Sequence, residues 1–163
     1  MIKITSDSTC DLSQELIQSL DITLLPLHIV VENDDYRDGV NITPLDIVNF
    51  VEKEKKRCQT AAVNTFEYQE FFAPLAKEHE AVIHFNIGAH FSSCHQNAKL
   101  AAEEFDNVYV IDSQNLSTGQ GSLVYEAALM AKEGRPAQEI LEKIEAMVPC
   151  IDTSFVIDKL DYL

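Results

Sequence analysis

The chain opens with the stretch Ile2-Lys3-Ile4-Thr5-Ser6-Asp7-Ser8-Thr9, in which an apolar run passes directly into hydroxyl and carboxyl side chains. A short apolar run bounded by turn residues is typical of a buried strand, which we predict over residues 2–5. Three further polar segments also follow apolar runs: Tyr36-Arg37-Asp38-Gly39, Gln59-Thr60 and Phe91-Ser92-Ser93. Ligands of α/β sheets bind at the carboxyl ends of strands, and hydroxyl-rich helix starts suit anions. The sequence therefore predicts a small-molecule site made of hydroxyl and backbone N–H groups.

The rest of the chain alternates strand-like and helix-like segments. Further strands are predicted over 22–31, where Pro26 interrupts the run, and over 81–86, 108–111 and 153–157. Helices are predicted from Thr43, 66–79, 92–105, 117–132 and from Pro136, the clearest start being Thr43-Pro44-Leu45-Asp46 with threonine as N-cap. Such alternation favours an α/β fold with a mostly parallel sheet that helices cover on both faces.

Composition limits the function classes. The 163 residues fit one domain, and 12 basic against 27 acidic residues give a formal charge of -15. This field repels phosphate backbones and anionic lipid surfaces, so no nucleic-acid partner is expected. No apolar stretch approaches the roughly 20 residues that span a bilayer. The four cysteines show no metal-ligand spacing and the chain has no signal-peptide pattern, so we expect reduced thiols and a cytoplasmic location.

The candidate site residues each have a plainer interpretation. Ser92 opens a predicted helix, where unpaired N–H groups would suit a carboxylate or phosphate, but an N-cap role alone also explains it. Thr60 would face the same pocket if its loop lay beside Ser92. For Asp7 we favour a structural role, in which its carboxylate accepts hydrogen bonds from loop amides. Ser92, His95 and Asp7 also leave open a second class, an α/β enzyme that acts on a small anionic substrate.

Several motifs together resemble the DegV family of bacterial lipid-binding proteins. The similar segments are Thr5-Ser6-Asp7-Ser8-Thr9-Cys10-Asp11, Tyr36-Arg37-Asp38-Gly39-Val40-Asn41-Ile42-Thr43-Pro44, Val110-Ile111-Asp112-Ser113 and Phe155-Val156-Ile157-Asp158-Lys159-Leu160-Asp161-Tyr162-Leu163. Each is weak by itself, but their order and spacing are specific. The resemblance implies a Rossmann-like α/β N-terminal domain over 1–163, paired in the family with a second domain.

The resemblance also implies a function. Family members are carriers without an established enzyme activity, and they hold a long-chain fatty acid for a partner fatty acid kinase. The threonine and serine that hold the carboxylate fall on Thr60 and Ser92, and the backbone N–H of Ser93 would assist. Ser6, Asp7, Asp112 and Ser113 would support the pocket and its loops. No catalytic residue, metal or cofactor is implied.

Two departures from the family pattern qualify this expectation. Ala61-Ala62-Val63-Asn64 replaces the usual polar run that ends in proline, and Cys94-His95 replaces threonine and tyrosine. The chain also stops where the family continues, so we expect a domain truncated before the second one. Burial of about 16 carbons is worth roughly 12 kcal/mol gross, and half a tunnel would retain about half of that. We therefore expect weak binding, and a possible homodimer through the exposed interdomain face.

Overall fold

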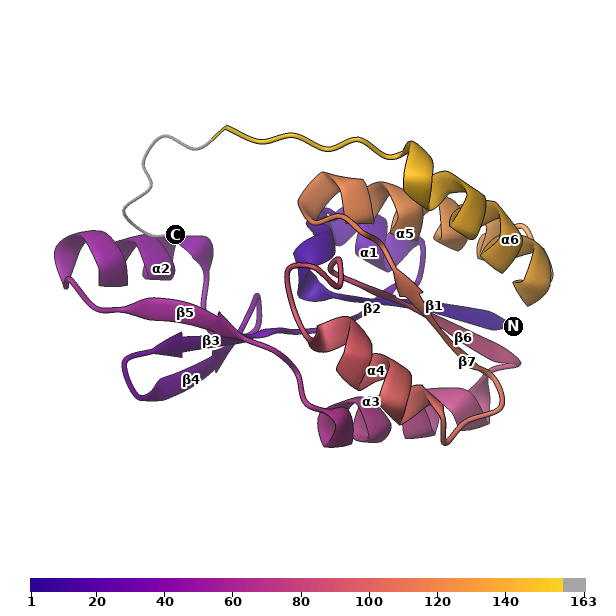
Figure 1. Cartoon of the computed structure of the whole chain (residues 1–163), viewed down its shortest axis with the longest axis horizontal. Coiled ribbons are helices and arrows are strands. Elements are labelled where there is room, and N and C mark those ends of the chain that lie inside the picture. The colour runs from indigo at the N-terminus through magenta and orange to yellow at the C-terminus, as the bar shows by residue number, and fades with distance from the viewer. Residues whose placement is uncertain (157–163) are drawn as a thin grey trace.

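The computed structural model describes residues 1–156 and contains a four-stranded parallel sheet at its centre (Figure 1). Its strands are β1 (Ile2–Asp7), β2 (Thr23–Leu25), β6 (Ala81–Asn86) and β7 (Val108–Asp112), in the order β2-β1-β6-β7. All three pairings are parallel. The predicted parallel α/β sheet is thus confirmed.

Helices cover both faces of this sheet, and we call the sheet and these helices the main body. The helices are α1 (Gln14–Ser19), α3 (Thr65–Glu78), α4 (Cys94–Ala102), α5 (Ser117–Lys132) and α6 (Ala137–Met147), with short 3-10 turns at Ser8–Cys10 and Val148–Cys150. Figure 1 shows α1, α5 and α6 on one face and α3 and α4 on the other. Val82 and Ile83, neighbours in β6, enter opposite core clusters because strand side chains alternate between faces.

A second, smaller sheet was not predicted. Antiparallel strands β3 (His28–Val31), β4 (Asp34–Arg37) and β5 (Cys58–Ala61) pair in the order β4-β3-β5. With α2 (Pro44–Val48) and the π-helical turn Asn49–Lys53 they form what we call the small lobe, at the left of Figure 1. Its core of Ile29, Val31 and Ile42 is separate from the two clusters of the main body. Pro26 falls between β2 and β3, so the two halves of the apolar run 22–31 join different sheets.

Two sequence expectations need correction. Thr60 lies in a strand and not in a loop, because β5 pairs with β3 although three of its four side chains are exposed. A strand that exposes most of its residues carries no apolar alternation, so its sequence gives little signal. Residues 153–156 form no strand. The remainder of the motif that ends at Leu163 lies outside the described residues.

Candidate functional site

The carboxyl ends of β1, β6 and β7 lie side by side and gather four of the predicted residues. Ser6 pairs with Phe85, and Asn86 pairs with Asp112. The loops that follow are joined as well: Asp112 Oδ1 accepts hydrogen bonds from the N–H of Ala89 and of Gln114, each at 3.0 Å. The Ser113 N–H donates to the Asn86 carbonyl. Ser6, Asp7, Asp112 and Ser113 therefore share this edge of the sheet.

Asp7 is the centre of the hydrogen bonding beneath that edge. Its carboxylate is fully buried. Oδ2 accepts from the Ile87 N–H at 2.6 Å, while Oδ1 accepts from Thr9 Oγ1 at 2.6 Å and from Gln120 Nε2 at 2.7 Å. Burial raises the pKa of Asp7, and these hydrogen bonds oppose the rise. Asp7 thus fixes the start of the loop over 87–93 that carries Ser92.

A buried histidine, His84, is linked to Asp7 through the Asn86 amide. His84 Nδ1 is 2.9 Å from Thr5 Oγ1, and Asn86 Nδ2 donates to His84 Nε2 at 3.2 Å. Both ring nitrogens of His84 therefore have a hydrogen-bond partner. Tyr68 packs edge-on against the imidazole, and burial lowers the pKa of His84 to about 3.

We predict that His84 makes the fold sensitive to acid. A histidine with a depressed folded pKa contributes stability above its ordinary pKa near 6.5, and this contribution is lost as pH falls toward 3. Between pH 7 and pH 5 the wild-type protein should lose about 2 kcal/mol more unfolding free energy than His84→Gln, measured by urea titration. His90→Gln, at an exposed position, should follow the wild type. Equal losses in wild type and His84→Gln would contradict the prediction.

The start of α4 carries Ser92 and Ser93. Ser92 is half-buried, and its Oγ accepts a hydrogen bond from the Cys94 N–H at 3.2 Å. Ser93 is exposed and occupies the N-cap position, but its side chain makes no capping bond. Within the described residues, the N–H groups of Ser93, His95 and Gln96 have no protein acceptor. Free N–H groups at a helix start, beside two hydroxyls, suit a carboxylate or a phosphate.

Thr60 lies apart from this cluster, on the small lobe. It is exposed on β5, a strand at the edge of its sheet, opposite Ile29. The connection from β5 to α3 returns to α4, where Asn97 Nδ2 donates to the Val63 carbonyl at 2.8 Å. Three residues span at most about 11 Å, so the Thr60 Cα lies within that distance of the Val63 Cα. No hydrogen bond joins Thr60 to Ser92 among the described residues.

The structure does not bring Ser92 and His95 together as the enzyme alternative requires. That alternative needs His95 within hydrogen-bond reach of Ser92, but no such bond exists in the described part of the chain, and Ser92 Oγ faces the Cys94 N–H. His95 Nδ1 is buried without a partner there, and burial lowers the pKa of this histidine. His95 instead lines a hollow of about 490 Å³ that it shares with Asp112 and Pro149.

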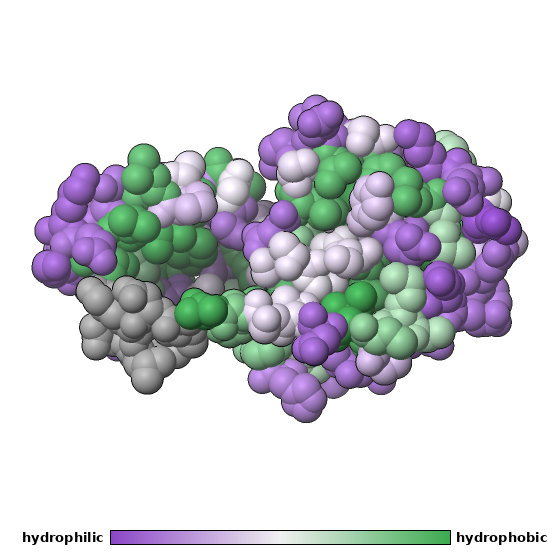
Figure 2. Space-filling model, turned by 90° about the horizontal axis from the view of Figure 1, so that it is seen from above, coloured by the Kyte–Doolittle hydropathy of each residue, from purple (hydrophilic) through white to green (hydrophobic). Residues whose placement is uncertain are grey.

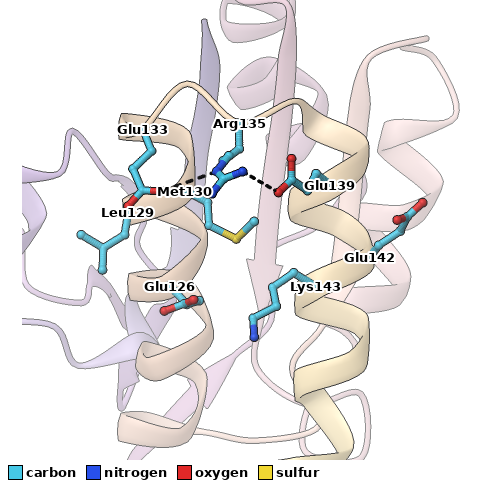
Figure 3. A pocket seen from close by; sticks show the side chains of 8 residues that line it. All are labelled: Glu126, Leu129, Met130, Glu133, Arg135, Glu139, Glu142 and Lys143. Atoms are coloured by element: carbon cyan, nitrogen blue, oxygen red, sulfur yellow. Dashed lines mark hydrogen bonds and ion pairs between the residues drawn. The ribbon is translucent and has the colours of Figure 1, made fainter.

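The largest of the described hollows does not suit an apolar ligand either. It measures about 690 Å³ and lies between α5 and α6 (Figure 3). Arg135 bridges Glu133 and Glu139 across it, with Nη1 at 3.1 Å from the Glu139 carboxylate. Apolar side chains instead gather on the small lobe, at the left of Figure 2, where Val40, Leu45 and Val48 are exposed.

Residues 1–156 contain no group of three or more His, Cys, Asp or Glu side chains placed to hold a metal ion. No helix among them has the length and apolarity to span a membrane. Cys10, Cys58, Cys94 and Cys150 are all free thiols.

The parallel sheet, covered by helices on both faces, defines the class of α/β domains, in which ligands commonly bind at the carboxyl edge of the sheet. A family model described as "Uncharacterised protein, DegV family" matches residues 1–163. The chain therefore belongs to the DegV family, as its motifs suggested. A curated DegV domain-containing protein of Caldanaerobacter subterraneus is 34% identical over 99% of this chain. The match covers 58% of that relative, so the chain spans less than two thirds of its length.

Solved structures show the same fold. A DegV family protein from Thermus thermophilus, described by its fatty-acid binding, has a TM-score of 0.84 at 30% identity, covering 91% of this chain and 53% of that one. A stearic-acid-binding protein from Eubacterium ventriosum has a TM-score of 0.79 at 30% identity, covering 90% and 53%. DegV from Bacillus subtilis, at 24% identity, agrees in fold with a TM-score of 0.84 over 91% and 54%.

Some residues that shape the site could not be recognised as such from the sequence. Asn86 and Gln120 complete the network around Asp7, but single amides in a strand or helix carry no motif. His28, Arg37 and Glu67 meet where the small lobe joins the main body. Of these three, only Arg37 lies in one of the polar segments that the sequence singles out. The pairing of His28 with Arg37 becomes visible once β3 and β4 are placed in register.

Proposed function

We propose that this chain is the ligand-binding N-terminal domain of a fatty-acid carrier. The observation that supports this proposal most is the start of α4, where Ser92, Ser93 and three free backbone N–H groups offer donors to one anion. The two relatives at 30% identity described as binding fatty acids supply the class of ligand. Ser92 Oγ and the Ser93 N–H would hold one side of the carboxylate, and Thr60 Oγ1 the other.

The acyl chain would lie between the small lobe and the main body, along apolar side chains that both parts expose. Phe91 is exposed next to Ser92, and Leu45 and Val48 are exposed on the small lobe. Each CH₂ that leaves water contributes about 0.8 kcal/mol, so an acyl chain gains from any such surface. One open face gives less burial than an enclosed tunnel, so the proposal includes weak binding by residues 1–163 alone. A second domain, or a second copy of this chain, would cover the same face.

We also propose that the protein acts without catalysis and presents its ligand to a kinase that phosphorylates the carboxylate. A carrier has to hold the carboxylate at a rim that a partner can reach, and both Thr60 and Ser93 are exposed. The free thiols agree with the proposed cytoplasmic location.

Native mass spectrometry of the purified protein tests the carrier proposal. We expect a non-covalent adduct with the mass of a long-chain fatty acid, released by mild denaturation, or uptake of added oleate by the empty protein. The same spectrum reports whether the chain is a monomer or a dimer. Protein that carries no fatty acid and takes up none from an excess of oleate would contradict the proposal.

A further inference from the structure

Four side chains meet where the small lobe joins the main body, and we call them the junction cluster: His28, Asp35, Arg37 and Glu67. His28 Nδ1 lies 2.8 Å from the Asp35 carboxylate, and its Nε2 lies 2.7 Å from Arg37 Nη1. Nε2 is also 3.1 Å from the Glu67 carboxylate, which accepts a hydrogen bond from Arg37 Nη2. Three members belong to β3 and β4, while Glu67 belongs to α3, so the contacts cross between the lobes.

Glu67 serves two elements with one carboxylate. It completes a capping box at the start of α3, where Oε2 accepts from the Asn64 N–H at 3.2 Å and from Asn64 Nδ2 at 2.7 Å. Its other oxygen, Oε1, binds Arg37 of the small lobe. The Glu67 side chain is 19% exposed and that of Arg37 is 36% exposed, so solvent screens their pairing less than it screens a fully exposed ion pair.

The two connecting segments also contact the main body, through the hydrogen bonds of Leu27 N–H to Ser8 Oγ and of Asn97 Nδ2 to the Val63 carbonyl, and through apolar packing. Leu27, between β2 and β3, and Val63, between β5 and α3, pack in the main-body cluster that contains Tyr68. The small-lobe core around Ile29 does not merge with that cluster. Apolar packing is non-directional, whereas charged hydrogen bonds fix an orientation. The junction cluster is thus a charged contact between the strands of the small lobe and α3 of the main body, suited to fix the orientation of the small lobe.

We propose that the junction cluster orients the small lobe so that Thr60 and Ser92 reach the same carboxylate, with Glu67 as a positioning residue. This inference rests on the proposed function. Thr60 is opposite Ile29 in the ladder, and Ile29 follows His28 directly, so a rotation of β3 about the junction moves Thr60 with it. Ser92 stays in place, because its loop is held by Asp7 and Asp112 of the main body.

Glu67→Gln isolates this role, because glutamine also serves at the third position of a capping box but lacks the charge that binds Arg37. Residual dipolar couplings of backbone amides report whether the two lobes share one alignment tensor, and they need no ligand. We expect one shared tensor in the wild type and two different tensors in Glu67→Gln. Glu70→Gln, which removes an exposed charge from the same helix, should retain one tensor. A single shared tensor in Glu67→Gln would overturn the proposal.

Binding of oleate and of methyl oleate then tests the effect on the site. Loss of orientation should weaken oleate binding about threefold to tenfold and leave the methyl ester, which has no carboxylate to grip, unchanged. In a Thr60→Ala background, Glu67→Gln should have no further effect on oleate. Equal weakening for acid and ester would indicate general disruption and overturn the positioning role. Failure of the wild type to bind oleate would contradict the proposed function itself. It would also overturn the positioning role of Glu67, because there would be no bound carboxylate for Thr60 and Ser92 to share.

Discussion

Replacing Thr60 and Ser92 together by alanine is expected to weaken oleate binding about 100-fold, the largest effect on ligand binding that we predict. Hydrogen bonds to a charged group contribute about 1.5–3 kcal/mol each, and every 1.4 kcal/mol is tenfold in affinity. Both hydroxyls are accessible, since Thr60 is exposed and Ser92 is half-buried. Titration of delipidated protein with oleate measures the loss, and native mass spectrometry should show no adduct on the purified variant.

The matched control removes two exposed hydroxyls elsewhere, at Ser19 and Ser122. That variant should bind oleate as the wild type does. Methyl oleate should bind the Thr60→Ala, Ser92→Ala variant and the wild type equally, because the variant loses only donors to the carboxylate. Undiminished oleate binding by the variant would show that the carboxylate lies elsewhere on the chain.

The sequence predicted the main body well because its elements carry independent and consistent signals. Residues 81–86 are mostly apolar, with His84 and Asn86 as the polar exceptions, and they form β6 with all six side chains buried. The helix predicted over 66–79 forms as α3 over Thr65–Glu78, and Asn64 and Glu67 complete a capping box at its start. Local chemistry decides such elements, so one sequence is enough to place them.

The small lobe was harder to predict because its strands are defined by long-range pairing. Cys58–Ala61 has no alternating pattern and becomes a strand only because His28–Val31 lies beside it. The site shares this difficulty: Ser92 could be placed at a helix start, but its relation to Thr60 depends on how two sheets meet. That relation is set by the junction cluster, whose members are 7, 9 and 39 residues from His28 in the chain.

Replacing Asp7 by alanine is expected to cost about 4 kcal/mol of unfolding free energy, the largest stability loss that we predict. The change removes a fully buried acceptor from the Ile87 N–H, from Thr9 Oγ1 and from the Gln120 amide. Thr9 and Gln120 each keep one further acceptor, whereas the Ile87 N–H keeps none among the described residues. Each buried group left unpaired costs about 1–3 kcal/mol, and entry of water offsets part of the sum. Urea unfolding measures the loss, and hydrogen exchange at the Ile87 amide should accelerate in the variant.

The isosteric change Asp7→Asn separates hydrogen bonding from cavity formation. Both carboxylate oxygens of Asp7 act only as acceptors. An asparagine would turn its NH₂ group toward one set of these donors, so Asp7→Asn should still lower the unfolding free energy by about 2 kcal/mol. Asp112→Asn is the matched control, because both N–H donors to Asp112 reach Oδ1 and the asparagine oxygen can keep them. An Asp7→Asn protein as stable as Asp112→Asn would mean that Asp7 does not hold the Ser92 loop through its charge. The expected contrast would instead show that the buried Asp7 carboxylate stabilises the start of the loop that carries Ser92.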